Sequence, residues 1–158
     1  MLVLDGEVER PLGLTAADLA ALPEAWQVRD VSQLDPSRRG RAVRLAGLLE
    51  AAGVRPAACY LTLHAWRDDF HASVPLAAVL ERAVVIYELA GGPLPVDQGG
   101  PFRFLVLDAA ACKSAEVDEC VSVKYVDRLE LSTERRFDNR PTDDRAHAAL
   151  HAQQSQQQ

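Results

Sequence analysis

The sequence predicts an α+β fold, a single mixed β-sheet domain with short helices. The main observation is that short apolar strands and short helical segments follow one another irregularly, without the repeated strand–helix alternation of a doubly wound sheet. The second is length, because 158 residues give one domain a real core but leave too little chain for two.

The first elements follow from local patterns near the N-terminus. Leu2–Gly6 alternates apolar side chains and ends in a glycine, which predicts a short strand entering a turn. Thr15 can cap a helix start, with Asp18 at the third helical position, and Pro23 then ends this helix early.

Two further elements are predicted before residue 54. Residues 26–31 have strand spacing, although the two faces are not cleanly separated. Residues 43–52 place apolar side chains at helical spacing, and Gly53 is a natural C-terminal cap for that helix.

The middle of the chain predicts a hairpin followed by a helix and a buried strand. Tyr60–Ala65 and residues 70–74 alternate as strands around a polar turn. Residues 75–82 carry apolar side chains on one helical face after a proline, and residues 84–89 form an apolar run.

The last third predicts a loop, two strands and a tail. Residues 90–100 hold four glycines and two prolines and are predicted to form a loop. Residues 102–107 and 125–131 are predicted strands. We therefore expect a folded domain over residues 1–131 and, over 132–158, a polar tail that is poorly ordered or packed on a neighbour.

Charge and hydropathy exclude two classes of partner. A net charge of −6 argues against nucleic-acid binding, which needs clustered Lys and Arg on the phosphates. One basic group, Arg38, Arg39, Arg41 and Arg44, is interpreted as a solvated loop and helix start. No apolar run approaches the ~20 residues of a membrane span, so we expect no membrane partner.

The N-terminus and the cysteines predict the compartment. Asp5 and Glu7 come too early for a signal peptide, which leads us to expect a cytoplasmic protein. The three cysteines, Cys59, Cys112 and Cys120, are an odd number, which argues against a disulfide framework.

Five segments, in order and at matching distances, resemble one family of cofactor-binding domains. The resemblance covers about residues 2–131 and is to the molybdopterin-binding domain of the sulfite oxidase superfamily, which includes the bacterial periplasmic methionine sulfoxide reductase catalytic subunit. It implies the mixed-sheet fold and a molybdopterin cofactor, with no other cofactor expected. The segments are RPLGLTAADLAALP (10–23), DVSQLDPSRRGRAVRLAGLL (30–49), SVPL (73–76), PLPVDQGGPFRFLV (93–106) and SVKYVDRLEL (122–131).

The resemblance places Asp30 at the position of the family's molybdenum-ligating cysteine. A soft thiolate suits that metal, whereas an aspartate is a hard oxygen donor on a short side chain. Asp30 is therefore the doubtful catalytic position. The structural alternative is a strand-end aspartate that accepts hydrogen bonds from nearby backbone N–H groups, and no metal ligands are predicted.

Three other residues are implied as cofactor-binding. Gln98 stands where the family has a histidine, so it can donate a hydrogen bond but cannot titrate. Arg103 keeps the family position, either as an anion anchor or as a salt-bridge partner of Asp97 or Asp108. The resemblance implies that Lys124 faces the pterin, although alone it would be an ordinary surface charge.

These residues leave two principal hypotheses for function. One is a molybdopterin-dependent oxidoreductase with atypical ligation. The other, which we favour on Asp30 alone, is a relative that lacks standard molybdenum redox catalysis and binds a pterin, another small anion or an unidentified protein partner. A thiol sensor built on Cys112 and Cys120 is a third reading, and a metal site joining them to nearby acids is a weaker one.

Histidines form two further groups. His64 and His71 flank the predicted hairpin, with Asp68 and Asp69 in its turn. They are interpreted either as a metal or proton-transfer cluster or, preferentially, as scattered polar residues. His147 and His151 have a spacing suited to clamping a metal ion on a helix, but lack further ligands nearby.

Overall fold

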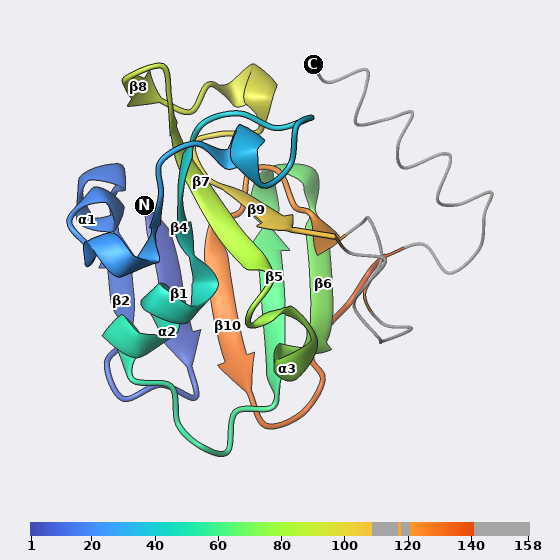
Figure 1. The fold of residues 1–158 in the computed structure, drawn as a ribbon. Helices are drawn as coiled ribbons and strands as arrows, with labels where there is room; N and C mark the ends of the chain where they lie inside the picture. Colours follow the sequence, from blue (N-terminus) through green and yellow to red (C-terminus); the bar gives the residue numbers. More distant parts are fainter. Residues whose placement is uncertain (109–116, 118–120, 141–158) are drawn as a thin grey trace.

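The computed structural model describes residues 1–108, 117 and 121–140, and within them two five-stranded sheets share one core (Figure 1). The first sheet has the order β2-β1-β10-β5-β6. Its β1 and β10 are parallel and the other neighbours are antiparallel, which confirms the predicted mixed α+β class. Its strands are β1 (Leu2–Gly6), β2 (Leu12–Leu14), β5 (Tyr60–Ala65), β6 (Phe70–Pro75) and β10 (Arg128–Ser132).

The second sheet is antiparallel throughout and has the order β3-β4-β7-β8, with β9 also paired to β7. Its strands are β3 (Gln27–Val28), β4 (Arg41–Arg44), β7 (Ala83–Leu89), β8 (Gly92–Pro93) and β9 (Arg103–Val106). The α-helices are α1 (Ala16–Ala20), α2 (Leu45–Ala52) and α3 (Leu76–Val79). The short 3-10 helices are η1 (Glu24–Trp26), η2 (Val31–Gln33), η3 (Trp66–Asp68) and η4 (Val96–Gln98).

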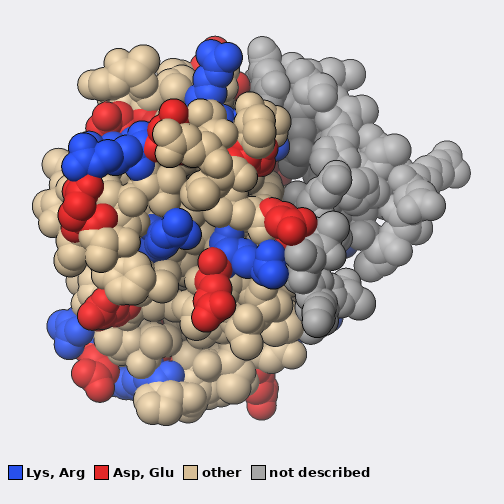
Figure 2. All heavy atoms as spheres, in the orientation of Figure 1, with Lys and Arg blue, Asp and Glu red and all other residues tan. Residues whose placement is uncertain are grey.

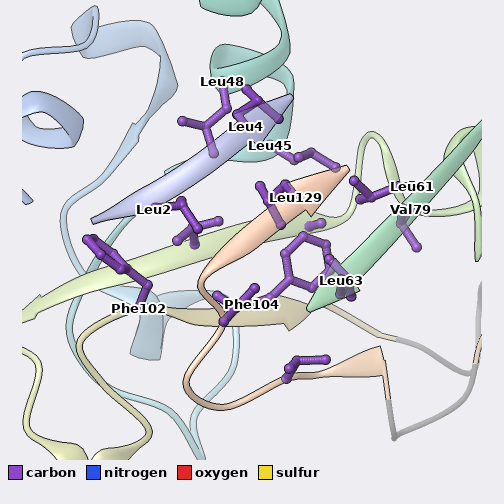
Figure 3. Close-up of a cluster of buried hydrophobic side chains, with 14 of the residues drawn as sticks. Leu2, Leu4, Leu45, Leu48, Leu61, Leu63, Val79, Phe102, Phe104 and Leu129 are labelled. Atoms are coloured by element: carbon purple, nitrogen blue, oxygen red, sulfur yellow. The ribbon is translucent and has the colours of Figure 1, made fainter. Parts of the chain in front are cut away.

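The main core lies between the two sheets and under α2 (Figure 3). Leu63 and Leu129 of the first sheet and Phe104 of the second are fully buried in it. Side chains alternate along a strand, so the opposite face of β7 carries Val84 and Ile86 into a second, smaller cluster. The second sheet is therefore covered on both faces.

The local signals with the clearest chemistry are confirmed. Thr15 and Asp18 form a reciprocal capping box, in which the Asp18 N–H donates to Thr15 Oγ1 (3.2 Å) and the Thr15 N–H donates to Asp18 Oδ2 (2.8 Å). Gly53 caps α2 in the left-handed region, with φ of +68°. The hairpin predicted between Tyr60 and Val74 is present as β5 and β6.

Five predicted elements were wrong in type or extent, one of them the strand predicted over 125–131, which begins only at Arg128. Only Gln27–Val28 of residues 26–31 is strand, because the chain turns into η2 directly afterwards. The helix predicted over 43–52 begins at Leu45, since Val43 pairs with Val85 as part of β4. The helix predicted over 75–82 covers only Leu76–Val79, and the 90–100 loop contains β8 and η4.

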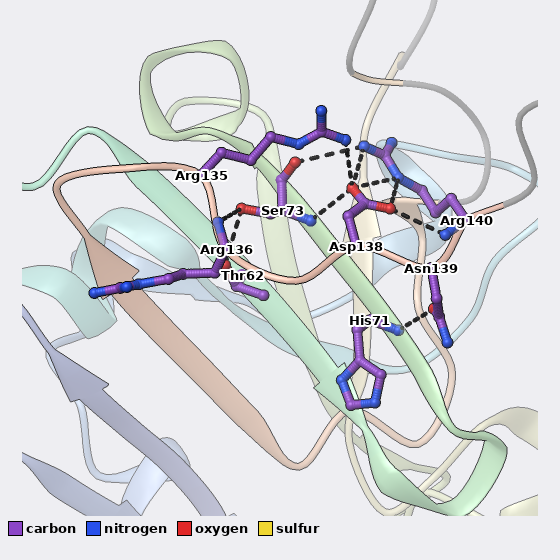
Figure 4. Close-up of polar contacts among 8 residues, drawn as sticks. All are labelled: Thr62, His71, Ser73, Arg135, Arg136, Asp138, Asn139 and Arg140. Carbon is purple, nitrogen blue, oxygen red and sulfur yellow. Dashed lines mark hydrogen bonds and ion pairs between the residues drawn. The ribbon is translucent and has the colours of Figure 1, made fainter.

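The chain after β10 packs along the free edge of β6. Residues 133–140, called the edge segment below, are held there by hydrogen bonds to the strand (Figure 4). The Arg136 N–H donates to Ser73 Oγ (3.0 Å), and the Ser73 N–H donates to Asp138 Oδ2 (2.9 Å). The described part of the predicted tail is thus bonded to the sheet, while 141–158 lie outside the described residues.

Candidate functional site

The side-chain stems of two basic residues pack around one glycine, Gly99. The segment that ends at this glycine lies at the end of the molecule opposite α2 and α3 (Figure 1). Gly99 caps η4 with φ of +92°. A Cβ built there would lie 3.1 Å from Cδ of Arg103, at the start of β9, and 3.0 Å from Cγ of Lys124. The Tyr125 N–H donates to the Gly99 carbonyl (2.8 Å), which fixes this approach. The absence of a side chain at position 99 lets the two cations converge.

Gln98 contributes to this site through its backbone. Its carbonyl accepts a long hydrogen bond, 3.3 Å, from Nη1 of Arg103. The structure therefore brings together Gln98, Arg103 and Lys124, the three residues predicted to bind cofactor.

A third cation, Arg38, completes what we call the cation cluster: Arg38, Arg103 and Lys124. Its charge acts on both of the others and lowers the pKa of each. The turn that places it is built by Asp35, whose carboxylate accepts from the N–H (3.0 Å) and the hydroxyl (2.7 Å) of Ser37. Sequence reasoning interpreted Arg38 as part of a solvated basic loop, and that interpretation was wrong for this residue.

Burial and mutual repulsion set the electrostatics of the cluster. Arg103 is 9% exposed, and burial, followed by the charge of Arg38, lowers its pKa to about 10. Burial, then Arg103 and Arg38, also lowers the pKa of Lys124 below the ordinary lysine value. Asp68, near Lys124, has a raised pKa because of burial.

Among the residues that the structure describes, the cluster has no direct carboxylate ion pair, although the charges of Asp35 and Asp68 lie near enough to act on Arg103 and Lys124 respectively. Within the described part of the chain, no salt bridge joins a carboxylate to Arg38, Arg103 or Lys124, and Nε of both arginines is buried without a hydrogen-bond partner. The alternative of an Arg103 salt bridge to Asp97 or Asp108 is therefore wrong, and Asp108 instead lies 3.9 Å from Arg82. The two buried Nε atoms that have no acceptor, those of Arg38 and Arg103, suit an anionic ligand.

Asp30 lies in a different setting. It caps η2, and its Oδ1 accepts from the Ser32 N–H (3.0 Å) and the Ser32 hydroxyl (2.5 Å), which lower its pKa. It also lines an open hollow of about 390 Å³, together with Arg29, Gly40, Arg41 and residues 88–91. The expected alternative, an aspartate bonded to a nearby backbone N–H, thus describes its contacts.

Comparison with known proteins identifies the family. Residues 40–139 match the model described as the oxidoreductase molybdopterin binding domain. The chain belongs to this family. The matched residues of the molybdopterin-binding domain include Gln98, Arg103 and Lys124, whereas the match begins after Arg38 and Asp30. The correspondence between Asp30 and the family cysteine therefore rests on the spacing of residues 30–49.

This molybdopterin-binding domain is also similar to two known proteins, one in sequence and one in fold. It is 32% identical over 105 residues to the "Uncharacterized oxidoreductase YuiH" of Bacillus subtilis (strain 168), a region that is 62% of this chain and 52% of that protein. The chain thus spans about half the length of this curated relative. It also resembles the crystal structure of the sulfane dehydrogenase SoxCD from Paracoccus pantotrophus, with a TM-score of 0.61 and 19% identity over 85% of this chain and 38% of that one, which shows a shared fold.

The histidines of the hairpin are not scattered. His64 and His71 are both buried and lie opposite one another in β5 and β6, with their Nδ1 atoms 2.7 Å apart. The preferred interpretation of unrelated polar residues at a hairpin tip was therefore wrong. In the described residues, no group of three or more His, Cys, Asp or Glu is arranged to hold a metal ion.

Other predicted features lie outside the described residues or on the surface. Four of the predicted features lie outside the described residues: Cys112, Cys120, His147 and His151. Cys59 is an exposed free thiol. The face seen in Figure 2 mixes basic and acidic side chains rather than presenting one continuous basic field. Among the described helices, none combines the length and apolar character that a membrane crossing requires.

Proposed function

We propose that this domain binds molybdopterin through the cation cluster and does not carry out standard molybdenum redox catalysis. The observation that carries the proposal is Arg103, a buried guanidinium beside two other cations, with Nε left without a partner. An anion seated among these groups would supply the missing acceptors and offset the repulsion between them.

Each member of the cluster has a role suited to its side chain. Arg103 offers a planar pair of donors for a phosphate group, whereas Lys124 offers a compact point charge. Gly99 leaves the backbone bare at the centre of the site, so a ligand can approach closely. These residues fit the phosphate and pterin end of the cofactor, and family resemblance also places Lys124 beside the pterin.

The metal end of the cofactor fits this chain less well. When bound, the cofactor supplies redox chemistry at a metal held by sulfur ligands. Asp30 would present oxygen in place of the family's thiolate, and its carboxylate is already engaged by Ser32. A change of ligand type alters both the affinity and the potential of a metal. We therefore derive no redox step for this chain, and propose that it acts by binding.

The test is to produce the full chain in a host with working cofactor synthesis and measure bound pterin and molybdenum. Acid release should yield fluorescent oxidised pterin from the wild type, and Arg103→Met and Lys124→Met should each lose most of it. Arg55→Met is the matched control, because Arg55 is an exposed arginine away from the cluster, and it should retain the pterin.

Two outcomes would contradict the proposal in separate parts. Wild-type protein without pterin would overturn cofactor binding and favour a module for another small anion, which binding of inorganic pyrophosphate would then test. Stoichiometric molybdenum that changes oxidation state on reduction, seen by electron paramagnetic resonance, would overturn the absence of redox chemistry.

A further inference from the structure

A buried histidine pair lies on the β5–β6 hairpin and is used by none of the chemistry above. His64 and His71 are directly opposed in the strand register, and only 6% and 2% of their surfaces are exposed. Trp66 stacks parallel to the His64 ring at 5.9 Å and packs edge-on against His71 at 4.7 Å. Phe137 of the edge segment also packs on His71, with the ring centroids 5.3 Å apart.

All four ring nitrogens of the pair are accounted for by three contacts. The two Nδ1 atoms face each other at 2.7 Å. Nε2 of His64 lies 3.0 Å from Oε1 of Glu130, and Nε2 of His71 lies 3.1 Å from Oδ1 of Asp69. The chain of contacts therefore runs from one carboxylate through both rings to a second carboxylate.

The number of protons follows from this geometry. Each contact needs one hydrogen, so three contacts need three N–H groups, whereas two neutral imidazoles carry only two. An ionised carboxylate can only accept. The Asp69 side chain is 84% exposed to water, and Oε2 of Glu130 lies 3.7 Å from Nη2 of Arg128, so both carboxylates have acceptor roles toward their other neighbours as well. The third hydrogen must therefore sit on the histidines.

We propose that His64 and His71 are a proton-binding site that shares one additional proton, so that the folded pair carries a charge of about +1. The charged groups of the surrounding elements include more carboxylates than cations, which supports a buried cation at this place. They are Glu130 and Arg128 of β10, Asp5 of β1, Asp127 before β10, Arg67, Asp68 and Asp69 of the hairpin turn, and Glu134, Arg135, Arg136, Asp138 and Arg140 of the edge segment.

The shared proton also affects the attachment of the edge segment to β6. The His71 N–H donates to Asn139 Oδ1 (2.8 Å), and the Asn139 N–H donates to the His71 carbonyl (2.9 Å) (Figure 4). Asn139 Nδ2 then donates to the carbonyl of Asp69 (2.6 Å), the residue that contacts the ring of His71. Loss of the third proton at high pH would leave one of the three contacts without a hydrogen, and where that contact is the one between His71 and Asp69, a lone pair would face the carboxylate and loosen this attachment.

The decisive experiment is to count ring N–H groups by ¹H–¹⁵N correlation spectra of the full chain with ¹⁵N-labelled histidine. Signals of the pair are assigned from His64→Asn and His71→Asn spectra. Near neutral pH the wild type should show three protonated nitrogens among the four, and one should be lost as the pH is raised. Two neutral rings with one N–H each at neutral pH would overturn the proposal.

A matched pair of variants tests the role of the carboxylate. Asp69→Asn can donate an amide N–H to Nε2 of His71, so the pair should hold only two protons in this variant. Asp108→Asn is the control, because Asp108 is also an exposed aspartate at a positive φ, +51° against +48° for Asp69, and it should keep three. Neither variant alters the cation cluster, so these outcomes are independent of pterin binding.

Discussion

Replacing Arg103 by methionine should make the protein without ligand more stable. Lowering the pKa of a guanidinium from the ordinary arginine value to about 10 means that folding disfavours its charged form. At about 1.4 kcal/mol for each pH unit, that penalty is ~3 kcal/mol. The side chain is only 9% exposed, so solvent screening reduces this figure little.

The substitution also removes a favourable contact. The hydrogen bond from Nη1 to the Gln98 carbonyl is long, 3.3 Å, so its contribution is about 1.5 kcal/mol, the low end for a bond from a charged donor. Methionine has a similar length and is flexible enough to fill the space left by the aliphatic stem. We therefore expect a net gain of about 1–2 kcal/mol, which for a chain of this size raises Tm by roughly 2–8 °C.

The assay is thermal and urea unfolding of the full chain at neutral pH in a buffer free of phosphate and sulfate. Arg55→Met serves as the control for loss of one positive charge and should change Tm by less than about 2 °C. Added inorganic pyrophosphate should raise Tm of the wild type more than that of Arg103→Met. If Arg103→Met is instead clearly less stable than the wild type, the guanidinium stabilises the fold, and the cluster is not an anion-binding site.

Three further predictions follow from single residues. The pKa of Lys124 is lowered, so the unfolded state binds more protons between the folded value and the ordinary lysine value. Unfolding free energy should therefore rise with pH through that window, and urea titrations should show a smaller rise for Lys124→Met. Asp30→Cys restores a thiolate donor and should increase molybdopterin retention, as measured by released pterin. Retention no higher than that of the wild type would mean that a thiolate at position 30 cannot reach the cofactor. Gly6→Ala should cost at least ~2 kcal/mol in urea unfolding, because φ is +89° and the new Cβ would meet the Leu131 carbonyl oxygen, whereas an unchanged midpoint would show that the β1 turn adapts.

Sequence reasoning worked where one residue type is needed for a local geometry. The capping box of Thr15 and Asp18 and the left-handed cap at Gly53 depend only on neighbours in the chain. It failed where a partner strand decides the conformation. Val43 fits a helical pattern, yet its pairing with Val85 makes it strand, and this pairing joins segments about forty residues apart.

The candidate site shows the same division. Gln98, Arg103 and Lys124 were predicted from motifs within the family-matched region, and they do meet around Gly99. Arg38 was missed because a basic loop has the same composition whether its side chains face water or a buried cation. The histidine pair was missed because its seven-residue separation acquires meaning only when the hairpin register places the two rings in contact.

The free energy that the cation cluster costs the folded protein is similar in size to the free energy that a bound ligand could supply. Holding Arg103 charged in the folded protein costs ~3 kcal/mol, a substantial fraction of the 5–15 kcal/mol by which domains are typically stable. A ligand that binds only the folded state, present at one hundred times its dissociation constant, stabilises by about 2.7 kcal/mol. A bound anion would therefore offset about the same free energy of unfolding as the charged guanidinium costs. A carboxylate next to Arg103 would remove the penalty permanently, but it would also occupy the donors that the ligand needs.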